Sequence, residues 1–331
     1  MGIKKLLLFL NNYQDLVCDT KITDYKGKRI AVDISLLLYK IVIGVRNTGS
    51  DITNSKGESV THIFGLFNKT ILLLSHNITP VYIFDGKPSA LKDSVILLRN
   101  KTKQNALNKL KESESETDKI KFYKKSAKIT KKELDECREL LDLMGIPYIN
   151  SPEESDSQCA YLAKTGLVDG VYTEDMDILT FGSPLIIKNL LSSKNKIQEI
   201  NLNNVLEKLK LTYDEFIDFC ILLGCDYSNG ISNINCQVIY DYYAQNKNIN
   251  TTLKALKSNS YNVPNNINYE VIKEYYKNAP YIEVDTSELE IQPIKTNELI
   301  DLLVNTYGLL KYKIIKKLAV LNKVSKLCVL D

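Results

Sequence analysis

Apolar residues fall into short runs separated by polar stretches, as is typical of an α/β protein. Residues 29–45 begin as a buried strand and continue as a helix, residues 61–78 fit an amphipathic helix, and residues 80–86 form a second buried strand. A strand, a long helix and another strand make a βαβ unit. The pattern therefore predicts an α/β fold with a central, mainly parallel twisted sheet flanked by helices.

The second half of the chain repeats this alternation before it becomes more helical. A helix is expected from Thr130, where Glu133 stands at the spacing of a capping box, and it leads into a short strand near Ile149. From about residue 230 helices prevail, with one polar interruption. The other expected elements are strands within 166–182 and 184–190, a helix within 211–227 capped by Thr or Asp, the polar interruption at 261–276, and one or two helices within 297–323.

Residues 88–132 lack a clean apolar stripe, and the segment KESESETDK at 111–119 is expected to form a loop or a frayed turn. Between Lys87 and Lys132 there are 14 basic and 5 acidic residues, although the whole chain carries a net charge of only +3. On charge alone, a solvated helical excursion is the simplest interpretation. A cationic segment beside an acidic pocket also suits a polyanionic substrate.

Composition narrows the class of protein. The 331 residues are 44% hydrophobic, enough for a sizeable core, and no window of 18 apolar residues predicts a membrane span. Two histidines, His62 and His76, make His-based triads and His-rich metal sites poor candidates. The cysteine number is odd and there is no CxxC pair, which predicts reduced thiols in an intracellular protein. The cysteines stand at 18, 137, 159, 220, 225, 236 and 328.

Seven carboxylates in five clusters adjoin apolar runs or helix starts. Acidic groups rarely enter apolar surroundings unless they are paired or bind metal. An Asp after a strand is often only a helix cap or a turn residue. Five such clusters nevertheless favour a single metal site. The residues are Asp33, Asp85, Glu154, Asp156, Asp175, Asp177 and Asp226.

The number of carboxylates fits two hard divalent cations. Mg²⁺ takes oxygen ligands and keeps several waters, and nucleases commonly hold two such ions. Glu154 and Asp156 flank one residue, as do Asp175 and Asp177, so both members of each pair can point into one pocket. If a helix starts at residue 155, Asp156 also lies in its first turn, where the helix dipole favours an anion. The spacing therefore indicates phosphoryl chemistry.

Several long motifs in this chain match one family. They are MGI at the N-terminus, AVDIS, VYIFDGKP, LMGIPY, SPEESDSQCA, TEDMDILTFGSP and CILLGCDY, in this order. From residue 1 to about 320 the chain resembles the flap endonucleases, which are structure-specific 5′ nucleases of DNA replication and repair. High Asn, Ile and Lys content and a short chain end suggest a compact, viral-type member.

The resemblance implies a PIN-like nuclease fold. Residues 1–331 are then a single nuclease domain, whose parts are an N-terminal nuclease region (1–100), a helical arch (88–132), an internal nuclease region (133–228) and a helical duplex-binding region (229–331). The last of these includes a helix-two-turn-helix-like segment. The charged excursion at 88–132 would be the arch through which a single-stranded 5′ end passes, guided by its phosphates.

The resemblance also assigns roles to individual residues. The seven carboxylates form the two-metal set, with Asp177 essential for catalysis and Asp156 where the family usually has Glu. Lys92 and Arg99 match the basic pair that acts on the scissile phosphate, although without the resemblance they are ordinary surface charges. Tyr39 matches the aromatic residue on which a flap base stacks, and Arg46 matches a residue near the junction; amphipathic helix packing is the alternative for both. The remaining expected DNA contacts are Gly2 (through its amine once Met1 is removed), Lys87, Lys128, Lys313 and Lys317.

The cofactors follow from the same resemblance. Two Mg²⁺ ions are expected, for which Mn²⁺ can substitute. The family's duplex-holding hairpin also binds K⁺, but here Asn233 and Asn235 stand where glycines are usual and Gln237 where a basic residue is expected. Asn tolerates left-handed conformations, so the hairpin can form. These departures weaken the case for a K⁺ site.

We therefore expect a Mg²⁺-dependent 5′ flap endonuclease and 5′–3′ exonuclease that hydrolyses DNA phosphodiesters at junctions. An RNA-cleaving nuclease of the same fold and a DNA-junction-binding protein with weak catalysis are the alternatives, and the complete carboxylate set disfavours the latter. The expected partner is DNA with a 5′ flap or junction. We find no sliding-clamp motif and expect a monomer in a reducing intracellular compartment, in the nucleus or at a cytoplasmic viral replication site.

Overall fold

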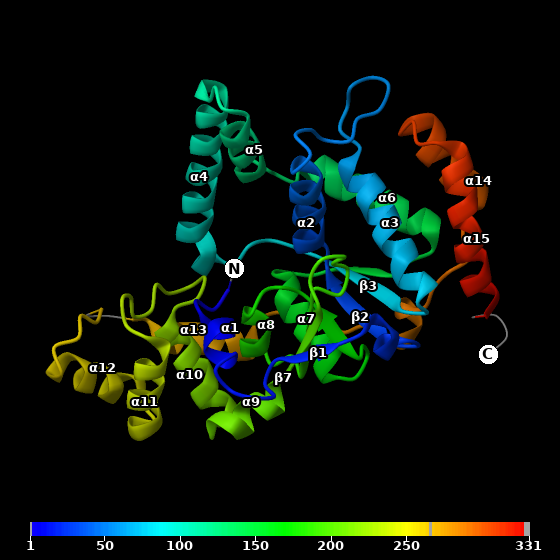
Figure 1. The fold of residues 1–331 in the computed structure, drawn as a ribbon. Coiled ribbons are helices and arrows are strands. Elements are labelled where there is room, and N and C mark those ends of the chain that lie inside the picture. The colour runs from blue at the N-terminus through cyan, green and yellow to red at the C-terminus, as the bar shows by residue number, and fades with distance from the viewer. Residues whose placement is uncertain (1, 265–266, 328–331) are drawn as a thin grey trace. The chain divides into compact units, whose positions relative to one another are not determined.

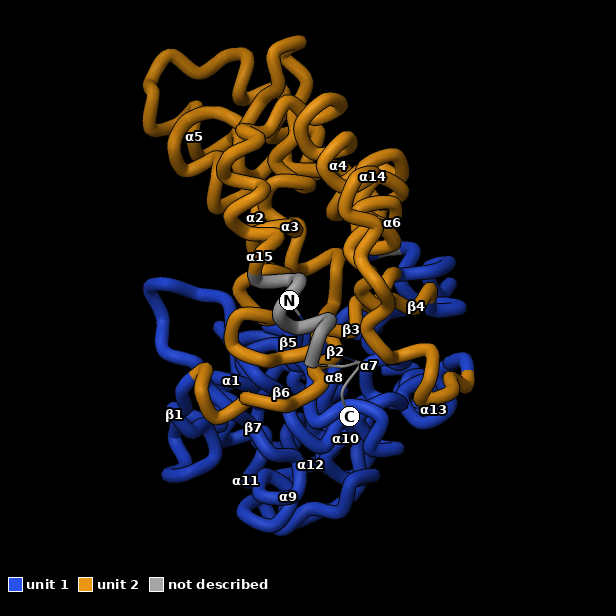
Figure 2. Tube along the Cα trace, turned by 90° about the vertical axis from the view of Figure 1, so that its right-hand side faces the viewer, with its two compact units in different colours: residues 1–21, 85–95, 151–282 blue, residues 22–84, 96–150, 283–331 orange. Residues whose placement is uncertain are grey.

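The computed structural model describes residues 2–264 and 267–327, and the chain divides into two compact units. Unit 1 consists of residues 1–21, 85–95 and 151–282, and unit 2 consists of residues 22–84, 96–150 and 283–331 (Figure 2). Each unit is thus built from three separate stretches of sequence. Met1 and Cys328, which entered the expectations above, lie outside the described residues.

Unit 2 contains the βαβ unit that the apolar pattern predicts. Strand β2 (Arg29–Asp33) pairs in parallel with β3 (Thr79–Phe84), and β3 pairs in parallel with β4 (Tyr148–Asn150). Helices α2 (Ile34–Arg46) and α3 (Thr61–Ser75) connect β2 to β3 and pack against each other. Every residue of β3 after Thr79 is buried, as expected of a strand covered on both faces.

The rest of unit 2 is helical. Helices α4 and α5 are joined by residues 113–115 (Figure 1), and α15 packs against α3. The elements are a 3₁₀ turn (Ile22–Tyr25), most of α4 (Asp93–Glu112, which starts in unit 1), α5 (Glu116–Lys125), α6 (Lys131–Met144), a second 3₁₀ turn (Thr286–Leu289), α14 (Thr296–Ile300), a π-helical turn (Asp301–Thr306) and α15 (Lys311–Leu327).

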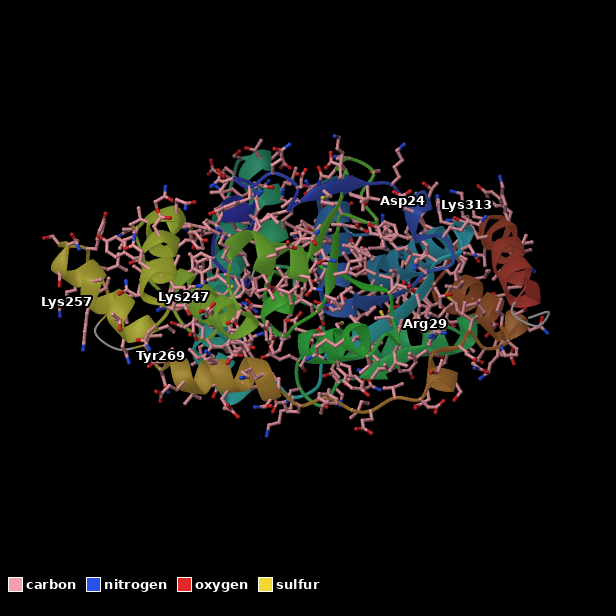
Figure 3. The ribbon with its side chains drawn as sticks, turned by 90° about the horizontal axis from the view of Figure 1, so that it is seen from below. Asp24, Arg29, Lys247, Lys257, Tyr269 and Lys313 are labelled. Atoms are coloured by element: carbon pink, nitrogen blue, oxygen red, sulfur yellow. The ribbon has the colours of Figure 1, made fainter. Side chains whose placement is uncertain are left out.

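Unit 1 has strands in the order β1-β7-β6-β5, with β5 and β6 parallel and the other two pairs antiparallel. Its helical part carries Lys247, Lys257 and Tyr269 (Figure 3). The strands are β1 (Cys18–Thr20), β5 (Gly170–Tyr172), β6 (Leu185–Lys188) and β7 (Ile197–Asn201). The helices are α1 (Leu6–Leu10), a 3₁₀ turn (Ala90–Lys92), α7 (Ser155–Lys164), α8 (Asp177–Thr180), α9 (Leu202–Leu209), α10 (Tyr213–Leu223), α11 (Cys236–Asn246), α12 (Ile249–Ser258) and α13 (Tyr269–Asn278).

The helix starts agree with the sequence. Thr130 and Glu133 form a complete capping box at α6, and Thr212, followed by Glu215, caps α10 in the same way. In both, the Thr hydroxyl accepts a hydrogen bond from the Glu backbone N–H, and the Glu carboxylate accepts one from the Thr backbone N–H. Three of the five strand pairs described above are parallel, which confirms the α/β class with a mainly parallel sheet.

Two segments expected to be irregular are more helical than their composition indicated. Only residues 113–115 of the polar segment 111–119 lie outside helices, because Glu116 and Asp118 occupy the first turn of α5, where acidic side chains favour the helix dipole. In the polar segment 261–276, helix α13 begins at Tyr269 and buries Ile272 and Tyr276. Tertiary burial of a few residues outweighed the polar composition in this segment.

None of the six described cysteines forms a disulfide, and five of them are buried. Among the described residues, no helix is long and apolar enough to cross a membrane.

A glycine pair tests the packing of α2 on α3. A Cβ on Gly65 would lie 2.1 Å from Cγ2 of Ile41, whereas nothing lies within 4 Å of a Cβ on Gly44. We expect Gly65→Ala to lower the melting temperature, because overpacking costs about 1–3 kcal/mol. The control Gly44→Ala should raise it, because Ala is favoured over Gly inside a helix by about 1 kcal/mol. Equal melting temperatures for the two variants would contradict this packing.

Candidate metal centre and nucleic-acid interface

Six of the seven predicted carboxylates belong to unit 1, and Asp33 belongs to unit 2. Asp33 ends β2 and caps α2, where its Oδ1 accepts the Leu36 N–H at 3.0 Å. Asp175 and Asp177 follow β5, and Asp177 is the first residue of α8. The carboxylates therefore stand at strand ends and helix starts, where polar groups of α/β proteins collect.

The turn before α7 fixes three of these acids. Asp85 Oδ1 accepts the Ser155 N–H at 2.9 Å, and Glu154 precedes the first helical residue. Asp156 lies in the first turn, as the sequence predicted, and is buried. A Cβ on Gly86 would lie 2.1 Å from the Ser151 carbonyl oxygen, so only glycine permits this close approach of the two backbones.

Lys92 places an ammonium group among the carboxylates. Its Nζ lies 2.7 Å from Glu154 Oε2 and 3.6 Å from Asp226 Oδ2, and only 14% of its side chain is exposed. Burial alone would lower the pKa of Lys92. The negative charges of Glu154, Asp156 and Asp226 outweigh burial and raise it, so the lysine stays protonated.

Asp177 is the most deeply buried member of the set, with 1% of its surface exposed. Neither of its carboxylate oxygens has a hydrogen-bond partner among the described residues. Burial, followed by the neighbouring charges of Asp175 and Asp226, raises its pKa well above the usual value, although Lys92 opposes this shift. A buried, unsatisfied carboxylate among like charges is the environment that a divalent cation would stabilise.

The donor set fits Mg²⁺ chemically, because it supplies only carboxylate oxygens and Mg²⁺ prefers oxygen. Within residues 2–264 and 267–327, however, no three His, Cys, Asp or Glu side chains gather as a ready-made ion site. Mg²⁺ usually keeps several of its waters and binds through one or two carboxylates together with substrate phosphates. The buried oxygens of Glu154 and Asp177 that lack hydrogen-bond partners fit such a partly hydrated Mg²⁺ ion.

Gly2 lies directly against this set. A Cβ on Gly2 would be 1.8 Å from Asp175 Oδ1, and the residue has a φ of +78°. Both the space and the backbone conformation therefore require glycine. This position brings the start of the chain to the carboxylates, as the resemblance implied, while its contact with DNA stays a prediction.

Tyr39 and Arg46 of α2 contact residues of the helical segment 96–125, which belongs to the same unit. Lys103 donates to the Tyr39 hydroxyl at 2.7 Å, and its ammonium lies 5.0 Å from the ring centroid. Arg46 forms a two-pronged ion pair with Asp51 and stacks over the Tyr123 ring at 4.1 Å. Both side chains thus have partners within the protein, and their DNA contacts remain predictions.

The other basic residues expected to contact DNA differ in exposure. Lys87, Lys128 and Lys313 are exposed, and Lys313 lies near the start of α15 (Figure 3). Lys317 donates to Asn68 on α3 and is half-buried, which gives it a structural partner. Arg99 lies on α4 within unit 2 and is partly exposed.

The segment that follows Asp226 keeps a tight turn without the family's glycines. Asn233 adopts a φ of +60°, which confirms that asparagine takes the left-handed conformation here. Asn235 caps α11 by accepting the Gln237 N–H at 2.8 Å, and Lys4 donates to the Asn229 carbonyl at 3.1 Å. A helix cap and a contact with Lys4 thus hold this segment, and its role as a duplex-holding hairpin stays a prediction.

The sequence reasoning passed over three partners of the site. Tyr227 donates to Glu154 Oε2 at 2.6 Å, Lys103 holds Tyr39, and Asp51 holds Arg46. Tyr227 had a detectable signal in the sequence, since it immediately follows Asp226 in the motif CILLGCDY. Asp51 and Lys103 had none, because they are polar residues in polar stretches whose partners are remote in sequence.

Known protein families and individual proteins match most of this chain. The XPG N-terminal domain family matches residues 1–106, and the XPG I-region family matches residues 145–226. Flap endonuclease 1 of Nematostella vectensis is 38% identical over 305 residues, covering 90% of this chain and 80% of that protein. Flap endonuclease 1 of Homo sapiens is 36% identical over 307 residues, with coverages of 91% and 81%. These relatives are animal proteins and give no support to a viral-type member.

Solved structures match over nearly the whole chain. Flap endonuclease-1 from Methanococcus jannaschii has a TM-score of 0.72 and 28% identity, covering 93% of this chain and 96% of that one. The catalytic core of Rad2 in complex with a DNA substrate has a TM-score of 0.74 and covers 97% and 100%. Its identity of 23% supports the fold alone.

Removing one buried charge tests the electrostatics of the site. The raised pKa of Asp177 means that its ionised form destabilises the folded, metal-free protein, increasingly so as pH rises above the unfolded value. Asp177→Asn should therefore raise the melting temperature in EDTA, and by more at pH 7 than at pH 4. The control is Asp169→Asn at an exposed position. A lower melting temperature for Asp177→Asn at pH 7 would rule out this destabilisation.

Proposed function

Because the chain belongs to the XPG and flap endonuclease family of structure-specific 5′ nucleases, we propose a division of labour among its residues for the hydrolysis of DNA flaps. The observation that carries this proposal is the buried Asp177 beside the protonated Lys92 within a set of carboxylates. Such a site is built to hold cations and a phosphate together.

We propose that two Mg²⁺ ions bind here, with Mn²⁺ able to replace them. Bound divalent ions generate a hydroxide nucleophile near neutral pH and neutralise charge on the phosphate and the leaving oxygen. The residues that would hold them are the seven carboxylates Asp33, Asp85, Glu154, Asp156, Asp175, Asp177 and Asp226. Asp156 has a shorter side chain than the family's usual Glu, which favours a water between it and the ion.

The basic residues of the site orient the phosphate. Lys92 already lies among the carboxylates, so its ammonium is available to stabilise the charge that develops on the scissile phosphate. Arg99 would bind the same phosphate, and Tyr39 would stack on a base of the single strand after Lys103 leaves its ring. Attack by water at the phosphodiester leaves a 5′-phosphate and a 3′-hydroxyl.

The remaining expectations rest on sequence. The 5′–3′ exonuclease activity follows if the site also accepts the end of a strand. We do not include K⁺ in the proposal because of the substitutions at Asn233, Asn235 and Gln237. The monomeric state and the reducing intracellular location stay predictions.

A panel of substrates tests the proposed function. Double-flap DNA, blunt duplex, a four-way junction and single-stranded RNA are offered to the wild type and to Asp177→Ala, with Mg²⁺ or with EDTA. We expect cleavage of flap DNA at the junction by the wild type only, and only with Mg²⁺. Preferential cleavage of RNA would overturn the assignment to DNA, and equal cleavage by Asp177→Ala would overturn the metal assignment.

The role of Lys92 is tested by separating binding from chemistry. Lys92→Ala should lower the single-turnover rate about 10²–10³-fold, as the loss of one charge-stabilising donor does, with a smaller loss of flap affinity. Lys194→Ala, on an exposed loop, is the matched control. A large loss of affinity at an unchanged single-turnover rate would show that Lys92 only binds DNA.

A further inference from the structure

One oxygen of Glu154 accepts two hydrogen bonds while the other accepts none. Lys92 Nζ and the Tyr227 hydroxyl both donate to Oε2, at 2.7 and 2.6 Å. Oε1 is buried and has no hydrogen-bond partner among the described residues. The two donors thus fix the carboxylate in one orientation and leave a single oxygen with its full capacity to bind a cation.

The Tyr227 ring is itself held in place by other aromatic rings. It meets Tyr275 and Tyr276 edge to face, with centroids 5.2 and 5.3 Å apart, and Tyr276 meets Phe181 at 5.0 Å. Edge-to-face pairs at these separations are favourable beyond the area that they bury. The hydroxyl therefore donates from a ring with little freedom to turn.

The ring also contacts the lysine. Lys92 Nζ lies 5.4 Å from the centroid of Tyr227, within the range of a cation–π interaction. One side chain thus touches both groups that must keep a defined position, the carboxylate through its hydroxyl and the ammonium through its ring.

We propose that Tyr227 is a positioning residue for the metal centre, which turns Oε1 of Glu154 toward the divalent cation and keeps Lys92 beside it. The inference rests on the proposed role of Glu154 as a metal-binding residue. Residues that orient metal ligands in this way are commonly worth about 10–100-fold in metal affinity or activity.

The neighbouring Tyr275 provides a matched control. It belongs to the same aromatic group, but its hydroxyl donates to Glu153 Oε2 at 2.9 Å, a carboxylate outside the predicted metal set. Tyr227→Phe and Tyr275→Phe each remove one hydroxyl and keep the ring. Tyr227→Leu removes the ring as well, and Glu154→Gln removes the proposed metal-binding charge.

The experiment measures Mg²⁺ binding to the full chain without DNA by titration calorimetry, beside the melting temperature in EDTA. We expect Tyr227→Phe to bind Mg²⁺ about 10-fold more weakly at a melting temperature close to that of the wild type. Tyr275→Phe should keep the wild-type affinity. The single-turnover rate of Tyr227→Phe should recover as Mg²⁺ is raised, because the defect lies in holding the ion.

Each other outcome has a defined meaning. Wild-type Mg²⁺ affinity in Tyr227→Phe, alongside weakened binding in Glu154→Gln, would overturn the positioning role while leaving the metal assignment intact. Unchanged affinity in Glu154→Gln would overturn the role of Glu154, and with it this inference. A melting temperature of Tyr227→Phe as low as that of Tyr227→Leu would assign the hydroxyl to structural stability and would equally overturn the proposal.

Discussion

The compensation of buried negative charge is the constraint on which the site depends. Asp177 is almost completely buried, and burial together with Asp175 and Asp226 disfavours its ionised form. Lys92, which forms ion pairs with Glu154 and Asp226, opposes this effect with its positive charge. A single ammonium cannot neutralise so many carboxylates, which supports the proposal that divalent cations complete the charge balance. The stability of this region and its proposed binding of metal would then be two consequences of one charge distribution.

Backbone geometry brings these charges together at the turn before α7. Asp85 binds the first N–H of that helix, and the close approach at Gly86 leaves no space for a side chain. Gly2 meets Asp175 under the same restriction. Gly2 lets the backbone approach an acidic side chain, whereas Gly86 lets it approach the main chain of Ser151 and Pro152, just before Glu154. The position of the acids is set by main-chain packing as much as by their own contacts.

In the cationic segment 87–132, contacts with α2 matter more than buried charge. Its charges are mostly exposed, but Lys103 and Tyr123 bind Tyr39 and Arg46 of α2. These two residues of α2, which are expected to contact DNA, therefore also contact the helical segment 96–125. Substrate that used them would have to replace these contacts, since each aromatic face and each guanidinium can serve few partners at once. Of the two alternatives for Tyr39 and Arg46, the structure shows contacts within the protein, and DNA binding stays a prediction.

The sequence by itself determined the elements whose signal is local. Apolar periodicity located β2, α2, α3 and β3, and hydroxyl–glutamate spacing located the starts of α6 and α10, because both signals reside within one turn or strand. The motifs identified the family and predicted which carboxylates bind metal. Tertiary structure alone decided that Tyr227 and Lys92 share one oxygen of Glu154 and that Asp51 engages Arg46. It also decided that α13 forms within a polar segment. These features depend on partners remote in sequence or on burial that composition does not encode, so folding had to bring the groups together before their chemistry could be seen.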